Sequence, residues 1–214
     1  MINLDRPRRI LAAALAGLAG YVDAVGFLSA DRYFVSFMSG NTTRLATDFV
    51  VERDRAFIPA LLIGGFVLGV AAGSVAAHLG GRWRKPAVLA FVTVLLGAGC
   101  GFALAGHVAP MMGCLVLAMG ALNATMQAGE VPVALTYLTG ALVRMGQGLA
   151  GLVTGRRVEG LPGYLALWMA LALGAALGAT VFLAFGPPSL WGAFAASVLL
   201  TLAGWRIARI SARS

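Results

Sequence analysis

The stretch Ser36-Phe-Met-Ser-Gly-Asn-Thr-Thr-Arg-Leu45 is polar within an otherwise apolar region, and it returns 100 residues later as Thr136-Tyr-Leu-Thr-Gly-Ala-Leu-Val-Arg-Met145. The glycine and the arginine coincide in the two stretches, as Gly40 with Gly140 and as Arg44 with Arg144. Ser39 is matched by Thr139 in the same register. A repeat that preserves rare polar residues predicts that the chain consists of two related halves.

The similarity continues on both sides of this stretch. Gly20-Tyr-Val-Asp-Ala24 corresponds to Gly120-Ala-Leu-Asn-Ala124, again at an offset of 100, so that Asp23 matches Asn123. Farther along, Gly69–Val75 resembles Gly174–Thr180 at an offset of 105. We therefore expect one transmembrane domain over residues 1–214, with a first repeat at about 10–105 and a second at about 111–207.

The composition indicates an all-α integral membrane protein. Hydrophobic residues make up 60% of the 214 residues and charged residues only 11%, whereas soluble domains are about 25% charged. The formal net charge of +8 comes from short basic clusters between apolar runs, which is the pattern that sets membrane topology. No basic face or nucleic-acid motif is present, so nucleic acid is not an expected partner. The expected partner is the lipid bilayer.

Eight apolar runs are long enough to be considered as membrane segments, which need about 20 residues to span as a helix. Two of them are the most polar, because they contain the repeated Ser/Thr-Gly-x-x-x-Arg stretch, and we expect these two to be broken or re-entrant. The runs cover residues 10–28, 34–51, 57–79, 86–105, 111–128, 131–153, 161–185 and 190–207.

Basic residues predict the orientation of the chain. The N-terminus, the loop around Arg82 and the C-terminus are basic and should be cytoplasmic, whereas the linkers 106–110 and 186–189 carry no Lys or Arg. An even number of crossings must then separate the N-terminus from Arg82, which gives about six full spans plus the two broken segments. Each half would contain three crossings, so the repeats would be inverted, in a bacterial inner membrane. The loop with Arg53 and Arg55 fits this scheme poorly, and seven or eight spans remain alternatives.

Inverted repeats with interrupted helices are typical of secondary transporters, whose substrates bind near the bilayer midplane against the broken helices. Gly40 permits unusual backbone angles, Ser39 and Asn41 are residues that cap helix starts, and the free N–H groups of such starts attract anions. We expect these segments to line a shared cavity. The candidate substrate-binding residues are Asp23, Ser39, Gly40, Asn41, Thr43 and Arg44 in the first half, and Asn123, Thr139, Gly140 and Arg144 in the second.

Two kinds of charged residue have competing interpretations. Asp23 lies about halfway along the first helix, where a carboxylate costs about 2.5–3.5 kcal/mol on insertion scales. It could couple transport to a proton or cation, or it could pair with Arg44 or cap the broken helix. Arg44 and Arg144 could face an anionic substrate from both repeats, or they could reach a lipid headgroup or a nearby carboxylate.

Other features predict packing or carry no chemistry. Gly65, Gly69 and Gly73, together with Gly174 and Gly178, form small-residue stripes that predict helix packing within a subunit or in a homodimer. Neither cysteine belongs to a metal or disulfide pattern, and no nucleotide or hydrolase motif is present. We therefore expect neither an enzyme nor a metal or cofactor.

The runs Gly20-Tyr-Val-Asp-Ala-Val-Gly-Phe-Leu28 and Phe34-Val-Ser-Phe-Met-Ser-Gly-Asn-Thr-Thr-Arg44 resemble the YoaK family of bacterial membrane proteins, the DUF1275 or UPF0700 group. Tyr137-Leu-Thr-Gly-Ala-Leu-Val-Arg144 fits this resemblance as well. The resemblance covers essentially the whole chain and implies a multi-pass membrane protein of unknown function. It also implies an Asn at the position of Ala141, so the second motif is less polar here than in relatives.

These observations favour a small-solute secondary transporter that works by alternating access, with an anionic or zwitterionic organic substrate. A channel or facilitator, an exporter of drug-like molecules and a non-transporting partner subunit are the alternatives. The sequence leaves the substrate, the coupling ion and the direction of transport open.

Overall fold

The computed structural model describes residues 6–125, 127–128, 131–132, 139–155 and 160–211. The chain is almost entirely helical over these residues. Its helices are α1 (Arg6–Ser29), α2 (Met38–Val51), α3 (Phe57–Gly80), α4 (Arg84–Leu104), α5 (Val108–Leu122), α6 (Thr139–Thr154), α7 (Leu161–Phe185) and α8 (Leu190–Ser211). Three single 3₁₀ turns, η1 (Arg53–Arg55), η2 (Gly81–Trp83) and η3 (Pro187–Ser189), and one short antiparallel pair, β1 (Gln127–Ala128) and β2 (Val131–Pro132), complete the described structure.

Four helical segments among the described residues are long and apolar enough to cross a membrane: Arg6–Ser29, Arg53–Leu104, Leu161–Phe185 and Pro187–Arg209. The second of these contains both α3 and α4, which fold back on each other after Gly81, a glycine in the left-handed region at φ 50°. The apolar helix α5 has 15 residues and is shorter than the others. These findings establish a multi-pass helical membrane protein, and they agree with most of the expected apolar runs.

The sequence-based bounds need correction in the two polar segments. The run expected over 34–51 is helical only from Met38, and residues 34–37 form a non-helical approach to α2. In the run expected over 131–153 the described helix is Thr139–Thr154, and residues 133–138 lie outside the described part of the chain. Like α5 with its 15 residues, both helices are shorter than the about 20 residues of a span, since α2 has 14 and α6 has 16.

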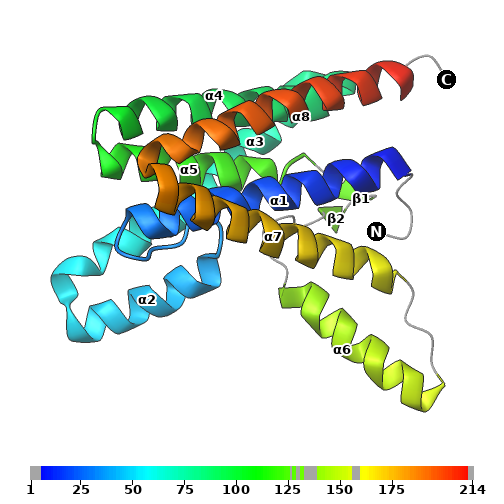
Figure 1. Ribbon diagram of the computed structural model, residues 1–214, viewed down its shortest axis with the longest axis horizontal. Coiled ribbons are helices and arrows are strands. Elements are labelled where there is room, and N and C mark those ends of the chain that lie inside the picture. Colours follow the sequence, from blue (N-terminus) through cyan, green and yellow to red (C-terminus); the bar gives the residue numbers. More distant parts are fainter. Residues whose placement is uncertain (1–5, 126, 129–130, 133–138, 156–159, 212–214) are drawn as a thin grey trace.

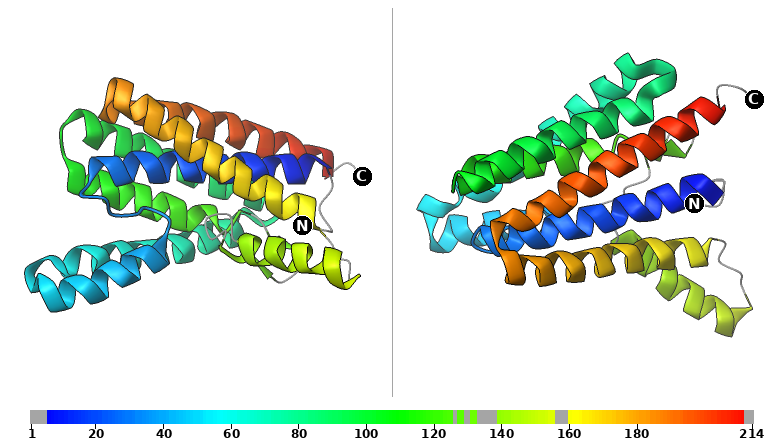
Figure 2. Two further views of the ribbon diagram at one scale, coloured as in Figure 1. Left: turned by 60° about the horizontal axis from the view of Figure 1, so that its bottom comes forward. Right: turned by 45° about the horizontal axis from the view of Figure 1, so that its top comes forward.

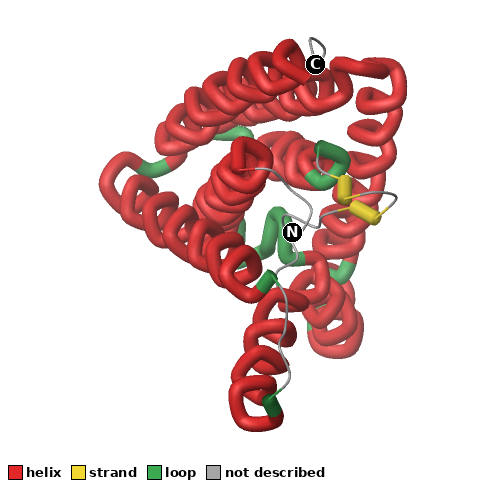
Figure 3. The backbone as a smooth tube through the Cα atoms, turned by 90° about the vertical axis from the view of Figure 1, so that its right-hand side faces the viewer, coloured by secondary structure: helices red, strands yellow, loops and turns green. Residues whose placement is uncertain are grey.

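The long helices run roughly parallel to one axis, and α2 and α6 lie together on one flank of this bundle (Figures 1 and 2). The start of α1, the turn between α3 and α4 and the end of α8 share one end of the bundle (Figure 1). In the view along that axis, α1 lies inside the ring that the other helices form (Figure 3). Many side chains of α1 and α5 are fully buried, among them Leu15, Val22, Leu115 and Met119. The core is therefore built on the first helix of each half.

Glycines bring the helix backbones into contact at two crossings. In the crossing of α1 with α7, Gly20 lies against the Leu171 carbonyl, Gly174 against Gly17 and Gly178 against Tyr21. In the crossing of α5 with α3, Gly120 lies against the Phe66 carbonyl, Gly69 against Leu117 and Gly73 against Ala121. A Cβ at Gly73 would lie 2.7 Å from the Cα of Ala121, and one at Gly178 would lie 2.9 Å from the Cα of Tyr21. Only glycine permits this approach.

Each contact of one crossing corresponds to a contact of the other at the offsets of 100 and 105 found in the sequence. The small-residue stripes therefore serve packing within one chain. The alternative expectation, a homodimer through these glycine-rich faces, has no support, because the helices α1 and α5 of the same chain already cover them.

Candidate functional site

Asp23 holds the non-helical segment that enters α2. Its Oδ1 accepts hydrogen bonds from the backbone N–H groups of Val35, at 2.7 Å, and Ser36, at 2.8 Å. Gly26 lies one turn later on α1 and leaves space for the side chain of Val35. A Cβ at Gly26 would collide with that side chain. The expected ion pair with Arg44 is not formed in the structure. The carboxylate does not cap α2 either, because it binds the N–H groups of residues 35 and 36, which precede the helix.

Asn41 of α2 also binds the backbone of this non-helical segment. Its side-chain Oδ1 accepts a hydrogen bond from the Phe34 N–H at 3.1 Å, and its Nδ2 donates to the Phe34 carbonyl at 2.7 Å. The side chain is fully buried. A carboxamide that pairs with both backbone groups of one residue replaces the sheet or helix partner that the extended segment lacks. Asp23 and Asn41 thus satisfy three consecutive backbone N–H groups of residues 34–36.

Arg44 and Asp48 of α2 both contact Tyr33, which precedes the same segment. The Arg44 guanidinium carbon lies 4.4 Å from the centroid of the buried Tyr33 ring, which is within the range of a cation–π contact. The Tyr33 hydroxyl donates to Asp48 Oδ2 at 3.2 Å. The buried Nε of Arg44 has no hydrogen-bond partner.

The start of α2 differs from the expectation in its details. Phe37 is the N-cap residue, and no side chain caps the helix, so the capping roles expected for Ser39 and Asn41 are wrong. Gly40 has an ordinary helical backbone, and its lack of a side chain leaves room for the rings of Phe34 and Phe37, which stack edge to face at a centroid distance of 5.1 Å. Ser39 and Thr43 are exposed.

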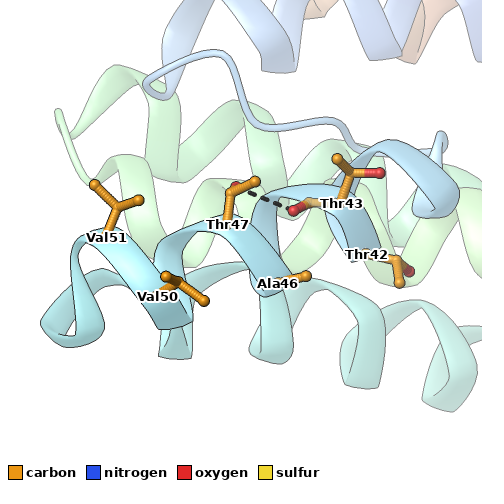
Figure 4. A pocket seen from close by; sticks show the side chains of 6 residues that line it. All are labelled: Thr42, Thr43, Ala46, Thr47, Val50 and Val51. Carbon is orange, nitrogen blue, oxygen red and sulfur yellow. Dashed lines mark hydrogen bonds between the residues drawn. The ribbon is translucent and has the colours of Figure 1, made fainter.

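A shallow groove of about 550 Å³ follows the outer face of α2. Thr42, Thr43, Ala46, Thr47, Val50 and Val51 line it (Figure 4). The threonine hydroxyls bond to carbonyls of the preceding turn, for example Thr43 to Ser39 at 3.2 Å and Thr47 to Thr43 at 3.0 Å. This face is therefore less polar than its sequence suggests, since its hydroxyl donors are already satisfied.

The second set of candidate residues is arranged differently. Asn123 lies at the end of α5, where its Nδ2 donates to the Met119 carbonyl at 3.0 Å. Thr139 is the first residue of α6, and Gly140 and Arg144 follow on its exposed surface. The helix packs on α7 and makes no contact with α2. The structure therefore gathers Asp23, Asn41 and Arg44 around one segment and leaves the second set apart, and none of the cavities described among the residues of known placement is lined by both sets.

The two short helices are nevertheless aligned. Each begins near the middle of the bundle's length, and their starting ends point toward each other before the helices run to opposite ends (Figures 1 and 2). The start of an α-helix carries unsatisfied N–H groups and a partial positive charge. This arrangement therefore directs two positive helix ends toward the central depth of the bundle.

Sequence reasoning overlooked Tyr33, whose ring contacts Arg44 and whose hydroxyl binds Asp48, and it considered Asp48 only as a charge partner of Arg44. One signal was available: Arg44 and Asp48 are four residues apart and so share a helix face. Among the described residues, no three His, Cys, Asp or Glu side chains are grouped as a metal site would require.

The family described as "Protein of unknown function (DUF1275)" matches residues 11–203 of the chain. A UPF0700 transmembrane protein of Rhizobium meliloti (strain 1021) is 42% identical over 200 residues, which cover 93% of this chain and 87% of the relative. No solved structure matches the chain. Since the family match extends over almost all of the helical bundle, the chain belongs to the DUF1275 family of proteins of unknown function.

Proposed function

We propose that the protein is a secondary transporter for a small solute, and that its substrate binds between the starts of α2 and α6. The observation that carries this proposal is the alignment of two short helices whose starting ends point toward each other at mid-bundle (Figure 1). Non-helical backbone at membrane depth is tolerated only against protein or a water-filled cavity. Transporters commonly use such interrupted helices to bind substrate near the bilayer midplane.

In the proposed architecture α1, α3, α4, α5, α7 and α8 cross the membrane, and α2 and α6 are re-entrant. The two halves are inserted in opposite directions, with both termini in the cytoplasm of a bacterial cell. The matching glycine contacts of the α1–α7 and α5–α3 crossings support a repeat of this kind. The common position of the α1 start, the α3–α4 turn and the α8 end supports an even number of crossings between them (Figure 1).

An anionic or zwitterionic organic substrate suits the chemistry of the two helix starts. At the start of α2 the N–H groups of Met38 and Gly40 already donate to the carbonyls of Ser36 and Phe37, so the N–H of Ser39 would bind its negative group, together with those near Thr139 and Gly140. Arg44 supports this assignment because it brings a positive charge to α2, one turn after Gly40. Arg144, at the matching position of α6, would contribute the second cation once α6 approaches α2. Thr43 lies on the groove side of α2 and would contact the substrate body.

Alternating access would proceed by motion of one half relative to the other around this site. Asp23 supports a coupling role, since its Oδ1 fixes the segment that positions α2. Protonation of that carboxylate would weaken both hydrogen bonds and release the segment. Coupling would be asymmetric, because Asn123 occupies the corresponding position and does not titrate.

Flux into proteoliposomes tests the proposal directly. Purified protein would be exposed to monocarboxylates, dicarboxylates and amino acids, and uptake would be measured with and without a proton gradient. We expect saturable uptake of one class that Arg44→Gln and Arg144→Gln each reduce at least tenfold. Arg55→Gln is the matched control, because Arg55 is exposed and pairs with Glu52 at 3.4 Å. Undiminished flux in both site variants would contradict the proposed site, and flux without saturation would favour a channel.

A further inference from the structure

A second cavity lies apart from the starts of α2 and α6, and the proposed function does not use it. It has a volume of about 600 Å³ and opens between α3, α5 and the turn that follows α1. Its walls are apolar. They are formed mainly by Ile58, Leu61 and Leu62 of α3 and by Val108, Met112 and Val116 of α5. In a membrane protein, an open apolar cavity of this kind faces hydrocarbon.

The cavity is polar only at one end. Asp31 lies there, and no described residue forms an ion pair or hydrogen bond with its carboxylate. The first residues of α3 and α5, Phe57 and Val108, line the same end. Two helix starts bring partial positive charge to the mouth, and Asp31 adds one negative charge. The mouth therefore suits a group that carries both a negative and a positive charge.

The backbone at the mouth is unusual. Asp31 and Arg32 have φ values of 41° and 60°, in the left-handed region that residues other than glycine rarely adopt. Two adjacent residues in this region form a strained turn, and such strain tends to occur at functional sites. Arg32 is held with its guanidinium 6.0 Å from the centroid of the Phe27 ring. The turn thereby places the Asp31 carboxylate at the cavity entrance.

The depth of the cavity fits one leaflet of a bilayer. Along α3 the lining residues run from Phe57 to Gly65, and along α5 from Val108 to Val116. At the rise of an α-helix, each of these stretches is about 12 Å long. One leaflet of hydrocarbon is about 15 Å thick, since the whole core is about 30 Å. An acyl chain entering from the mouth would therefore extend toward the midplane along the apolar walls.

We infer that this cavity binds one phospholipid with an amine-containing zwitterionic headgroup, of the phosphatidylethanolamine type. One acyl chain occupies the apolar part between α3 and α5. The phosphate lies at the starts of these two helices, and the primary ammonium group pairs with Asp31. The inference does not depend on transport, because Asp31 and the apolar wall residues lie outside the proposed substrate site, although Tyr33, which also lines the cavity, contacts Arg44 of that site.

Gly113 offers a way to fill the cavity without disturbing the fold. It lines the cavity on α5, and a Cβ built there meets nothing within 4 Å. Gly101 on α4 is the matched control, because it is also helical, exposed and free of neighbours at the Cβ position, but it does not line the cavity. Gly113→Leu and Gly101→Leu therefore add the same side chain to similar helical positions.

Native mass spectrometry of the delipidated protein, titrated with phosphatidylethanolamine, phosphatidylcholine or phosphatidylglycerol, tests the inference. We expect one tightly held phosphatidylethanolamine in the wild type and in Gly101→Leu, and at least tenfold weaker binding in Gly113→Leu. Asp31→Asn should bind phosphatidylethanolamine and phosphatidylcholine equally, because it lacks the carboxylate that selects a primary ammonium. Equal lipid occupancy in all four proteins would mean that the lipid is annular only, and it would overturn the inference. So would a wild type without headgroup preference.

Discussion

Replacement of Asp23 separates the structural role of its carboxylate from a role of its charge. Asp23→Ala removes the acceptor of the Val35 and Ser36 N–H groups. Asp23→Asn keeps an oxygen acceptor at the same place and removes the negative charge. The second half of the chain carries Asn123 at the corresponding position of the sequence, where the helix α5 ends.

The magnitude follows from the two hydrogen bonds. A hydrogen bond to a charged group contributes about 1.5–3 kcal/mol, and a buried donor left without a partner costs a similar amount. Because both bonds are only part-buried, we expect Asp23→Ala to lower the free energy of unfolding by about 2–4 kcal/mol. In Asp23→Asn the weaker neutral bonds are offset by removal of a carboxylate from the membrane helix. This variant should therefore stay close to the wild type, with a change of about 1 kcal/mol.

Reversible unfolding in mixed detergent micelles, followed by tryptophan fluorescence, measures both values. Asp54→Ala serves as the control, since Asp54 is exposed in η1 and its replacement should change stability by less than about 0.5 kcal/mol. If Asp23→Asn is as unstable as Asp23→Ala, the charge itself holds the segment and the hydrogen-bond reasoning is refuted. A stable Asp23→Asn protein can then be tested for flux, where loss of the response to a proton gradient alone is expected.

Three further predictions concern packing, topology and the segment before α2. Gly120→Ala should lower the free energy of unfolding by about 1–3 kcal/mol in the same assay, because its Cβ would lie 3.0 Å from the Val70 nitrogen and closer still to the Phe66 carbonyl oxygen. Gly64→Ala is the control and should leave stability unchanged, since a Cβ at Gly64 meets open space. In a cysteine-free background, cysteines at positions 31 and 54 should react with an impermeant maleimide from the same side of the membrane, and labelling from opposite sides would exclude a re-entrant α2. Asn41→Ala leaves both backbone groups of residue 34 without their partner and should increase proteolysis or hydrogen exchange of residues 30–37, in contrast to the exposed Thr47→Ala.

The sequence was informative wherever local hydropathy decides the outcome. The apolar runs of α1, α3, α4, α7 and α8 were located to within a few residues, because insertion into lipid depends on the apolar content of one continuous segment. The glycine register also came from the sequence. Its meaning required the structure: Gly69 and Gly174 can face a neighbour in the same chain or in a second copy, and only the tertiary arrangement shows that the neighbour is in the same chain.

The polar groups could be named but not paired from the sequence. Asp23, Asn41 and Arg44 were all recognised as candidates, yet their partners are the Val35 N–H, the backbone of Phe34 and the ring of Tyr33. These partners lie in a segment whose own residues carry no periodic pattern. Which donor meets which acceptor depends on how far that segment folds back along α1, and hydropathy contains no information about this.

By itself, the sequence therefore determined that the chain lies in a membrane and which of its polar residues are unusual, and it predicted two related halves. The tertiary structure decided that α2 and α6 lie outside the main bundle, that their starting ends are aligned without touching, and that an apolar cavity forms between α3 and α5. The physical reason is the range of the forces involved. Partition into lipid acts on each segment separately, whereas hydrogen-bond satisfaction and close packing depend on residues that meet only after the helices have assembled.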